Sequence, residues 1–400
     1  MTAHCPIHDR ATQRASKPPS ACRPVRRWPK LMRHTGTGTL CALFGLAGPV
    51  LAAPAQASAS PFGPGPFGPG GVAPGSVVVA QGGTVAGDGT GVTGSGVEAD
   101  GGVNVYSPYS NGNVAPEASF TNGMYGPFVV IFDPSGDMWA ANTDTSTLVE
   151  LRRDQLGTPN PEPAVTISAP ASAPHALDNP YGMAFDRWGD LWVVGNSAGK
   201  VYEYTRSQLA RSGSPTPRTT ITDFPGTPLG DGFDPFGDLW VTIQLSTACP
   251  QGCVVEFPPA ELAMPDPAPT VTISSTGGAN IAFTARGDMW MVTGGGSDCY
   301  GTPCNNELVE FTRAQLATSG APTPAVTISA TEVGTNESLY GPYGVAVDSF
   351  GDVWVSNFNT PTAVEFGRYQ LLRSGSPAPL RTIVGPNTGM NWPSFVVLAP

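Results

Sequence analysis

The stretch DPSGDMWAAN, residues Asp133–Asn142, returns four more times along the chain. The later copies read DRWGDLWVVGN, DPFGDLWVTIQ, TARGDMWMVTG and DSFGDVWVSN. Alignment on the Gly-Asp-apolar-Trp core places the tryptophans 53, 48, 50 and 64 residues apart, at Trp139, Trp192, Trp240, Trp290 and Trp354. A period of about 50 residues is typical of solenoids and propellers. The motif therefore marks a repeated structural unit.

Each repeat continues with the same strand and turn signals. After the tryptophan come an apolar-Glu-apolar segment and a Gln-Leu or Glu-Leu pair, as in VELRRDQL, YEYTRSQL, VEFPPAEL, VEFTRAQL and VEFGRYQL. A Pro-rich connector and a β-branched run such as PAVTIS complete the unit. With 50 glycines and 43 prolines in 400 residues, the chain is predicted to be all-β, each unit being four short strands in a meander. Glycine is expected to supply a positive φ in the first turn, at Gly136, Gly189, Gly237, Gly287 and Gly351.

Five complete repeats close into a ring only if the two chain ends supply a sixth. Trp392–Leu398 has the pattern of a first strand, and Val103–Thr121 has the pattern of a third and a fourth strand. A sheet built from both ends removes the open edge that is the usual liability of a sheet. We therefore predict a six-bladed β-propeller of four-stranded antiparallel blades over residues 85–400, with the second strand of the closing blade within Val85–Asp100. The alternative, a solenoid, usually has shorter periods and polar caps.

Residues 1–57 have the pattern of a signal peptide. Leu40–Leu51 is an apolar run preceded by Arg33 and followed by small residues, and Met32 is an alternative start of translation. The run is too short to cross a bilayer, so we expect no transmembrane segment in the mature chain. Residues 58–84, which contain PFGPGPFGPGG, read as a Pro/Gly-rich linker. The expected location is therefore secreted, periplasmic or in the cell envelope.

The charge of the chain argues against one class of partner. Eight of the 20 Lys and Arg residues, and one of the 31 Asp and Glu residues, fall in residues 1–57, which leaves 12 basic and 30 acidic residues downstream. An acidic surface repels phosphate backbones, so nucleic acid is not an expected partner. A polar small molecule, a wall polysaccharide or a secreted protein is the expected partner class.

Four of the seven cysteines lie downstream of the signal region, in two close pairs. Cys249 with Cys253, and Cys299 with Cys304, can each close a small loop in an oxidising compartment. The competing interpretation is a four-thiolate zinc site, but the three- and four-residue spacers differ from the usual C-x2-C arrangement. We expect two disulfides.

The strand signals resemble known repeats. The pattern Pro-x-Gly-apolar-Ala-apolar-Asp, followed by Gly-Asp-apolar-Trp, resembles NHL-type repeats, the gluconolactonase family and the streptogramin lyases over roughly residues 100–400. The resemblance implies a propeller fold. Propellers of this kind serve as hydrolases, lyases and binding modules alike, so the resemblance does not choose an activity.

The functional residues of these families do not carry over. Gluconolactonase-like enzymes hold a divalent metal with a glutamate early in the first strand, where this chain has Pro127-Phe128, Pro180-Tyr181, Pro228-Leu229, Ala279-Asn280 and Pro342-Tyr343. Streptogramin lyases often carry Glu three residues beyond the tryptophan, where this chain has Asn142, Gly195, Ile243, Thr293 and Asn357. These lyases also need a histidine, and His175 is the one histidine downstream of residue 57. No catalytic residue is assignable.

Features shared by all repeats are expected to belong to the frame, and departures from the repeat to mark a site. The tryptophans are predicted to pack between blades. The recurrent glutamates are predicted to form surface ion pairs, at Glu150, Glu203, Glu256, Glu310 and Glu365. Asp231 departs from the pattern, because the equivalent residues are apolar: Val130, Met183, Ile281, Val345 and Val396. A buried carboxylate needs donors, a cation or water, so Asp231 is either satisfied by backbone N–H groups or part of a site with Asn280 of the next repeat.

Loops between the second and third strands, and between consecutive blades, are expected on one face of the propeller. The other ligand-binding candidates on that face are Asn142, Asp144, His175, Asn196 and Asn357. A mouth lined by amides and carboxylates suits a polar ligand or a divalent cation such as calcium, with Asp231 as the best metal candidate. The sequence thus predicts an exported binding or interaction module. The alternative is a metal-dependent hydrolase or lyase acting on a lactone or cyclic ester.

Overall fold

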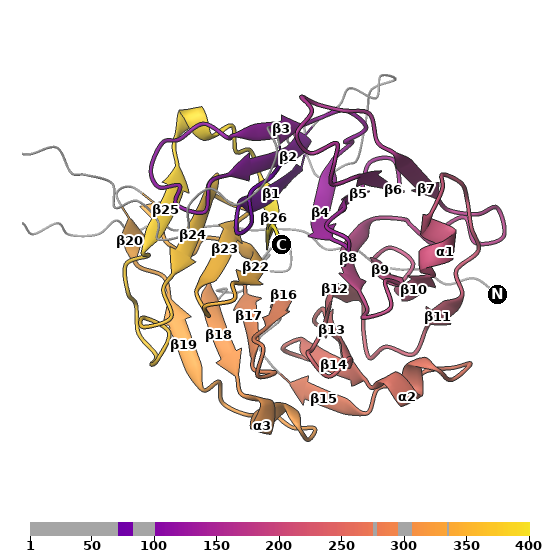
Figure 1. The fold of residues 1–400 in the computed structure, drawn as a ribbon. Coiled ribbons are helices and arrows are strands. Elements are labelled where there is room, and N and C mark those ends of the chain that lie inside the picture. The colour runs from indigo at the N-terminus through magenta and orange to yellow at the C-terminus, as the bar shows by residue number, and fades with distance from the viewer. Residues whose placement is uncertain (1–70, 83–100, 275–277, 295–305, 334–335) are drawn as a thin grey trace, which may run out of the picture. The chain divides into compact units, whose positions relative to one another are not determined.

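The computed structural model describes residues 71–82, 101–274, 278–294, 306–333 and 336–400. Six four-stranded antiparallel sheets lie around a common centre and form a six-bladed β-propeller, as the sequence predicts (Figure 1). Among the described residues, no helix is long and apolar enough to cross a membrane.

The bounds of the strands follow blade by blade, from the innermost strand outward. Blade 1 has β4 (Pro127–Phe132), β5 (Met138–Asn142), β6 (Thr147–Leu151) and β7 (Val165–Ser168), and blade 2 has β8 (Pro180–Phe185), β9 (Leu191–Gly195), β10 (Lys200–Tyr204) and β11 (Thr219–Ile221). Blade 3 has β12 (Pro228–Phe233), β13 (Leu239–Ile243), β14 (Cys253–Phe257) and β15 (Val271–Ser274), and blade 4 has β16 (Gly278–Phe283), β17 (Met289–Thr293), β18 (Glu307–Phe311) and β19 (Val326–Ser329). Blade 5 has β22 (Pro342–Val347), β23 (Val353–Asn357), β24 (Thr362–Phe366) and β25 (Arg381–Val384). The closing blade has β26 (Pro393–Leu398), β1 (Val77–Gly82), β2 (Gly101–Tyr106) and β3 (Ala118–Phe120), and a small hairpin of β20 (Glu332–Val333) and β21 (Asn336–Glu337) lies between blades 4 and 5 in sequence.

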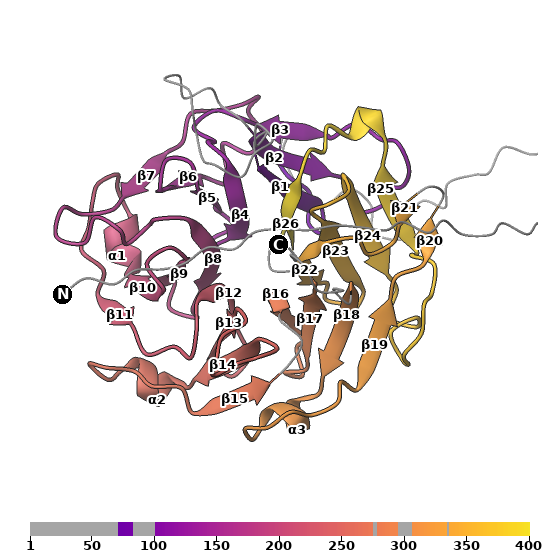
Figure 2. The ribbon, with the colours of Figure 1, turned by 180° about the vertical axis from the view of Figure 1, so that it is seen from behind.

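The innermost strands form a closed ring. In the order β4, β8, β12, β16, β22 and β26, each strand contacts the next, and β26 contacts β4. The view from behind shows the same six strands around the centre (Figure 2). We call these six strands the inner ring.

The closing blade is built from both ends of the described propeller. β26 pairs antiparallel with β1, and β1 pairs antiparallel with β2. The predicted first, third and fourth strands of this blade are confirmed. The second strand is β1, Val77–Gly82, which lies in the range assigned to the linker, whereas it was expected within residues 85–100, which lie outside the described residues. β1 is almost fully buried and reads as a continuous apolar run without the repeat motif, so periodicity alone does not find it.

The recurrent motif builds the turn between the first two strands of its blade. In blade 1 the Asp133 carboxylate accepts hydrogen bonds from the backbone N–H groups of Ser135 (2.7 Å) and Asp137 (2.9 Å). Gly136 closes this turn with the predicted positive φ, 85°. The Asp137 carboxylate accepts the N–H of Arg153 at 2.7 Å, where the connector after the third strand begins. The motif therefore serves the frame of the propeller.

The tryptophans fill the space between neighbouring blades, as predicted. Trp139, Trp192 and Trp240 are each 2% exposed. Each lies against a phenylalanine at the end of the first strand of the next blade, with ring centroids 6.2 to 6.3 Å apart: Trp139 with Phe185, Trp192 with Phe233, and Trp240 with Phe283. Aromatic contacts of this kind bind one blade to the next.

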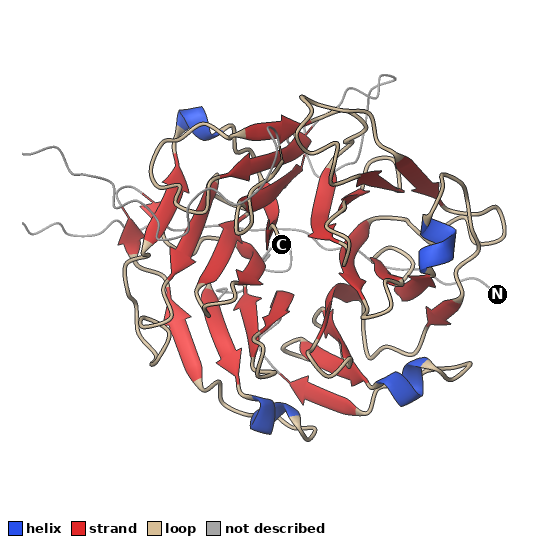
Figure 3. Ribbon diagram, in the orientation of Figure 1, coloured by secondary structure: helices blue, strands red, loops and turns tan. Residues whose placement is uncertain are grey.

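The described helices are single turns at the rim of the propeller (Figure 3). Three of them follow third strands, α1 (Arg206–Leu209), α2 (Pro259–Leu262) and α3 (Arg313–Leu316), and a 3-10 turn, Pro386–Thr388, precedes β26. α1 begins with a capping box in which Thr205 and Gln208 exchange hydrogen bonds. The Gln208 amide also donates to the carbonyl of Thr216 at 2.6 Å, so this residue ties the Pro-rich connector to the turn.

The glutamates of the third strands are more buried than the predicted surface pairs. Glu150, Glu203 and Glu365 are 7%, 0% and 3% exposed. Glu203 and Glu365 do form ion pairs, with Arg218 and Arg381. Because blades of a propeller pack face to face, the faces of an interior strand are covered, and the pairs lie inside the frame.

Candidate functional site

One residue of the inner ring departs from the sequence repeat. The fourth residues of its six strands are Val130, Met183, Asp231, Ile281, Val345 and Val396. Five of these side chains are apolar and one is a carboxylate, as the sequence alignment indicates. Asp231 lies on β12, opposite Val241 of β13, in the middle of blade 3's innermost pair of strands.

Asp231 is a buried carboxylate without a hydrogen-bond partner in the described part of the chain. It is 4% exposed, and both carboxylate oxygens are unsatisfied. Burial raises the pKa of Asp231 well above its usual range, and the approach of its own backbone N–H offsets only part of this effect. A Cβ added to Gly182 of β8 would come within 2.7 Å of Asp231 Oδ1. The carboxylate therefore occupies room that the missing side chain of Gly182 provides.

Asn280 has the same character one blade further on. It is 1% exposed, and neither atom of its amide group has a hydrogen-bond partner among the described residues. A Cβ added to Gly230 of β12 would come within 3.2 Å of Asn280 Nδ2 and within 2.6 Å of the Ala279 carbonyl oxygen. β12 carries Asp231 and β16 carries Asn280, and these two strands are neighbours in the inner ring. We call Asp231 and Asn280 the inner-ring pair.

Several oxygen atoms that could bind a cation or a water lie near the inner-ring pair. The Thr242 hydroxyl accepts the N–H of Gly230 at 2.8 Å and lies 3.3 Å from the carbonyl oxygen of Ala279. Carboxylate oxygens and the carbonyl oxygens of amides are ligands that calcium prefers. A buried water with two to four polar partners would also satisfy these groups. Each buried polar group left without a partner costs about 1–3 kcal/mol. An occupant that supplied hydrogen bonds or coordination to these side chains would remove this cost.

An aromatic cluster lies where the strands of the inner ring begin, at the end that the loops between consecutive blades enter. We call this end the loop end. Phe128, the second residue of β4, stacks on Tyr181 of β8 with ring centroids 4.4 Å apart and meets Tyr343 of β22 edge-on at 4.9 Å. β4 and β22 are not neighbours in the inner ring, so Phe128 reaches across it. Phe358 lies 6.1 Å from Tyr343, and 5.3 Å from Trp392, which is 38% exposed.

Sequence reasoning missed this cluster. Its signal is nevertheless present, because the second residue of the first strand is aromatic in three blades, at Phe128, Tyr181 and Tyr343. Those residues were compared only with the glutamate of a known metal site. That the rings meet depends on the closure of the propeller, which no local pattern describes.

Asn142 and Asn357 hold the loops that enter their own blades. The Asn142 amide accepts the N–H of Tyr125 at 3.0 Å and donates to the carbonyl of Gly123 at 2.8 Å. Asn357 makes the equivalent contact with the N–H of Tyr340 at 3.1 Å. Both asparagines are 0% exposed. These hydrogen bonds give the two asparagines a structural role in the loops that precede β4 and β22.

The remaining candidates lie in three separate loops. Asp144 is in the turn between β5 and β6. Asn196 donates to the carbonyl of Pro228 at 3.0 Å and so joins blade 2 to blade 3. The His175 side chain is 76% exposed, and its Nδ1 lies 2.5 Å from the carboxylate of Asp178 in the same loop. Of the predicted site residues, Asp231 and Asn280 are the two that the structure places on adjacent inner-ring strands.

Cys249 and Cys253 form a disulfide, as predicted, with their Cα atoms 5.6 Å apart. The bond closes the loop between β13 and β14, in the blade that carries Asp231. Both cysteines are buried. The second predicted pair, Cys299 and Cys304, lies outside the described residues.

Two acidic groups of the frame also have a geometry that could hold a cation. They are Asp186, Asp190 and Glu203 in blade 2, and Asp133, Asp137 and Glu150 in blade 1. In blade 2 the Arg218 guanidinium lies 3.1 Å from Asp190 and pairs with Glu203. In blade 1 Arg152 lies 3.6 Å from Glu150, and burial, followed by the charge of Asp137, raises the pKa of Glu150 to about 7. Because these groups recur and the chain supplies their cation, we assign them to the frame.

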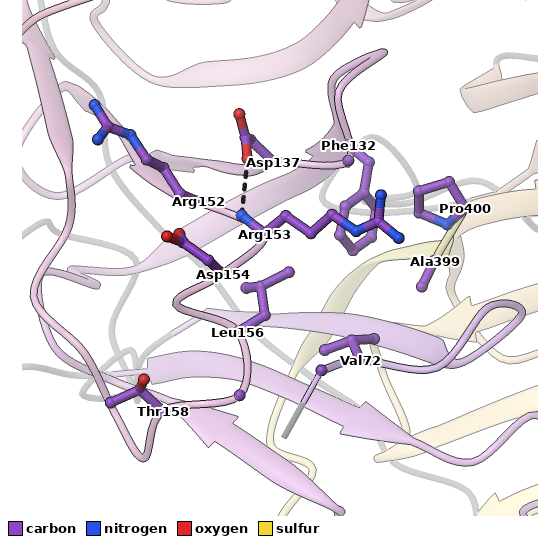
Figure 4. Close-up of a pocket in the computed structure, with 13 residues that line it drawn as sticks. Val72, Phe132, Asp137, Arg152, Arg153, Asp154, Leu156, Thr158, Ala399 and Pro400 are labelled. Atoms are coloured by element: carbon purple, nitrogen blue, oxygen red, sulfur yellow. Dashed lines mark hydrogen bonds between the residues drawn. The ribbon is translucent and has the colours of Figure 1, made fainter. Parts of the chain in front are cut away.

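A pocket of about 600 Å³ is lined by residues of blade 1 and by both ends of the closing-blade segments (Figure 4). Its lining includes Phe132, at the end of β4, and Ala399, just after β26. Arg153 extends along it beside Phe132, and its backbone N–H donates to Asp137. None of the predicted site residues lines this pocket.

Comparison with known proteins describes the fold of this chain. No protein-family model and no curated protein matches it. A protein of unknown function from Bacteroides caccae is 10% identical over 81% of this chain and 98% of its own, with a TM-score of 0.51. A nidogen/laminin complex structure is 11% identical over 81% and 98%, with a TM-score of 0.50, and a streptogramin B lyase is 15% identical over 66% and 70%, with a TM-score of 0.43. At such identities the shared feature is the propeller.

Proposed function

We propose that this chain is an exported propeller module that binds a polar ligand at the loop end of its inner ring, with the inner-ring pair at the centre of the site. One observation carries the proposal. Asp231 and Asn280 are buried on adjacent strands, and neither has a hydrogen-bond partner in the described part of the chain. Buried polar groups of this kind call for an occupant or a function, because native proteins rarely leave them unpaired.

The occupant that we propose next to Asp231 is a divalent cation, with calcium favoured. Asp231 would supply carboxylate oxygens and Asn280 its amide oxygen. The Thr242 hydroxyl and the Ala279 carbonyl lie beside Gly230, the residue that precedes Asp231. One carboxylate makes a weak calcium site, so we expect a dissociation constant on the order of 10⁻⁴ to 10⁻³ M, the range of extracellular modules. This range suits an exported protein.

The polar ligand that we propose above the cation is a carbohydrate. Tyr181 and Trp392 are partly accessible members of the aromatic cluster, and aromatic rings with a few polar groups are the usual lining of small-ligand sites. Wall polysaccharide is the source that fits an exported protein. A secreted protein partner is the competing outcome.

Calcium titration tests the proposal directly. We expect millimolar calcium to raise the thermal midpoint of the wild type, Asp231→Asn to abolish this response, and Asn280→Leu to weaken it. Glu256→Gln is the matched control, because Glu256 is a frame acid of the same blade that already accepts a hydrogen bond from Thr270 at 2.9 Å. A wild type that ignores calcium would refute the cation, and unchanged glycan-array binding by Trp392→Ala would refute the carbohydrate surface.

Export is supported by the pattern of residues 1–57 and by the disulfide in blade 3, which an oxidising compartment favours. Fractionation of the producing cell and N-terminal sequencing of the mature protein test it. A mature chain found in the reducing compartment with its first 57 residues intact would contradict this part of the proposal.

The rival proposal is a metal-dependent hydrolase or lyase acting on a lactone or cyclic ester at the same end of the ring. A histidine could serve it as a general base, but His175 is largely exposed and pairs with Asp178 within its own loop. Binding is therefore better supported. Turnover of a lactone that is lost on chelation and in Asp231→Asn would favour the rival.

A further inference from the structure

The outer strand of a blade is usually covered by a segment of the next blade. At β7 of blade 1, this segment is Ser212-Gly213 of the blade 2 connector, which runs parallel to the strand. The N–H of Gly213 donates to the carbonyl of Thr166 at 3.0 Å, and the carbonyl of Gly213 accepts the N–H of Ser168 at 2.9 Å. The Ser212 hydroxyl oxygen accepts the N–H of Thr166 at 3.0 Å. We call this three-bond contact a latch.

The latch recurs at other joints of the propeller. The same contact is made by Ser319-Gly320 on β15, by Ser374-Gly375 on β19 and by Asn111-Gly112 on β25. At β3 one side chain replaces it, because Asn160 accepts the N–H groups of Thr121 (2.7 Å) and Asn122 (2.8 Å). Four outer strands are therefore covered by a latch, and at β3 the Asn160 side chain binds only the two N–H groups that follow the strand.

β11, the outer strand of blade 2, has neither the latch nor a substitute for it among the described residues. Thr220 is the equivalent of Thr166, since it lies opposite Tyr202 as Thr166 lies opposite Val149. In the described residues, which include the whole blade 3 connector, no bridge or hydrogen bond reaches the outward N–H and carbonyl of Thr220 or the N–H of Thr222. Within the described part of the chain, β11 therefore has an open edge.

The sequence explains why the latch is missing at this joint. The blade 2 connector reads RSGSP at residues 211–215, whereas the blade 3 connector reads MPDP at residues 264–267 and is one residue shorter. The serine acceptor and the glycine are both absent, and Pro265 has no N–H to donate. The covering segment is missing here, and β11 has three residues where the four latched outer strands have four.

We propose that the open edge of β11 binds an extended peptide of a partner protein, laid parallel to the strand as the latches are. An unpaired edge is a template for strand addition, and main-chain hydrogen bonds give such binding its affinity. The four latches define the peptide chemistry: a Ser or Asn acceptor followed by a residue that keeps its N–H. Glycine is not required for room, because a Cβ at Gly213, Gly320 or Gly375 would meet no atom within 4 Å.

Charged residues near β11 indicate which residue is expected to precede the Ser or Asn of the bound peptide. Arginine precedes the serine in two latches, at Arg211 and Arg373. Asp223, just beyond β11, is exposed, and the exposed Asp266 lies in the connector that replaced the latch. A basic residue before the Ser or Asn is therefore favoured at this edge.

Hydrogen exchange of the full chain with the synthetic peptide RSGSPTP, a copy of residues 211–217, tests the proposal. At millimolar peptide we expect slower exchange at the amides of Thr220 and Thr222. The control peptide RAPSPTP lacks both the acceptor and the donor of the core and should bind at least tenfold more weakly. No protection at these amides with RSGSPTP, or equal protection with the control peptide, would overturn the proposal.

Two variants of the chain separate edge binding from other effects. Replacing residues 264–267 by RSGSP should install a latch, protect the Thr220 amide without peptide and abolish the effect of added peptide. Thr222→Pro removes one donor from the edge and should weaken peptide binding at least tenfold with an unchanged circular dichroism spectrum. Peptide binding that persists in both variants would place it elsewhere. A wild-type dimer that the latch replacement dissociates would identify a second copy, and not a partner peptide, as the occupant.

Discussion

Glu203 and Asp231 are both buried carboxylates, and their surroundings differ. Glu203 belongs to the repeat, is 0% exposed and pairs with Arg218, which also lies 3.1 Å from Asp190. Asp231 occurs in one blade, is 4% exposed and has no hydrogen-bond partner in the described residues. Glu203 and the arginine that pairs with it belong to the same repeat. Asp231 departs from the repeat, and no described residue of its blade supplies a hydrogen-bond partner. The difference separates the frame of this propeller from its candidate site.

The strongest way to break this comparison is to remove the partner of Glu203. Arg218→Met leaves a buried carboxylate uncompensated, so we expect the free energy of unfolding to fall by about 2–4 kcal/mol. Urea denaturation at neutral pH measures the change. The exposed Arg211 in the same connector is the control, and Arg211→Met should change stability by less than about 0.5 kcal/mol. A stable Arg218→Met variant would show that the frame acid needs no partner.

The opposite sign is expected for Asp231→Asn in the absence of calcium. Burial raises the pKa of Asp231 in the folded chain, so the stability that this group contributes is present at low pH and is lost as the pH rises through the folded pKa. We expect the variant to be more stable than the wild type by about 2 kcal/mol near pH 8, and the difference to shrink near pH 4. Urea titrations with a chelator measure it. A loss of stability near pH 8 would mean that the ionised carboxylate is already satisfied, which would end the contrast with Glu203.

Glu150 sharpens the comparison, because it is a frame acid with a weaker partner than Glu203. Burial, followed by the charge of Asp137, raises its pKa to about 7. The folded pKa exceeds the unfolded one, so wild-type stability should fall as the pH rises through this value. Glu150→Gln should remove about 1–2 kcal/mol of that fall between about pH 5 and pH 8. Glu203→Gln is the control, and it should lose stability across the same range because it breaks the pair with Arg218. Identical pH profiles for wild type and Glu150→Gln would contradict the assignment.

The smallest effect concerns the disulfide of the blade that carries Asp231. It closes a short loop, so Cys249→Ser with Cys253→Ser should lower the free energy of unfolding by only about 1–2 kcal/mol. Thermal midpoints with and without reductant measure this. If the loop helps to shape the site, calcium affinity should fall in the variant. Unchanged affinity would confine the site to the inner ring itself.

The repeat could be predicted from the sequence because its residues have the same task in every copy. Asp133 binds its own turn, Gly136 adopts a positive φ and Trp139 fills the space beside the next blade. Because these residues have the same structural role in every blade, they recur in the sequence at intervals of about 50 residues. Asp231 was found in the same way, as an acid in an apolar column. Alignment of the repeats with one another therefore indicates both the number of blades and the exceptional residue, Asp231.

What could not be predicted depends on contacts between distant segments. The room for Asp231 comes from Gly182 of another blade, and the aromatic cluster depends on Phe128 meeting Tyr343 across the ring. The burial of Glu203 results from the packing of whole sheets and leaves no mark in its own strand. The strand Val77–Gly82 carries no repeat residue because its blade is shared between two ends of the propeller.

The pairing of β26 with β1 also sets the timing of folding in the cell. Residues 393–398 leave the ribosome after blades 1 to 5 have been made, so the nascent protein carries an incomplete sheet until translation passes this point. A polypeptide truncated before residue 393 keeps an unpaired β1 edge and is exposed to self-association and to proteases. Pairing of β26 with β1 therefore removes this unpaired edge only after residues 393–398 have been made.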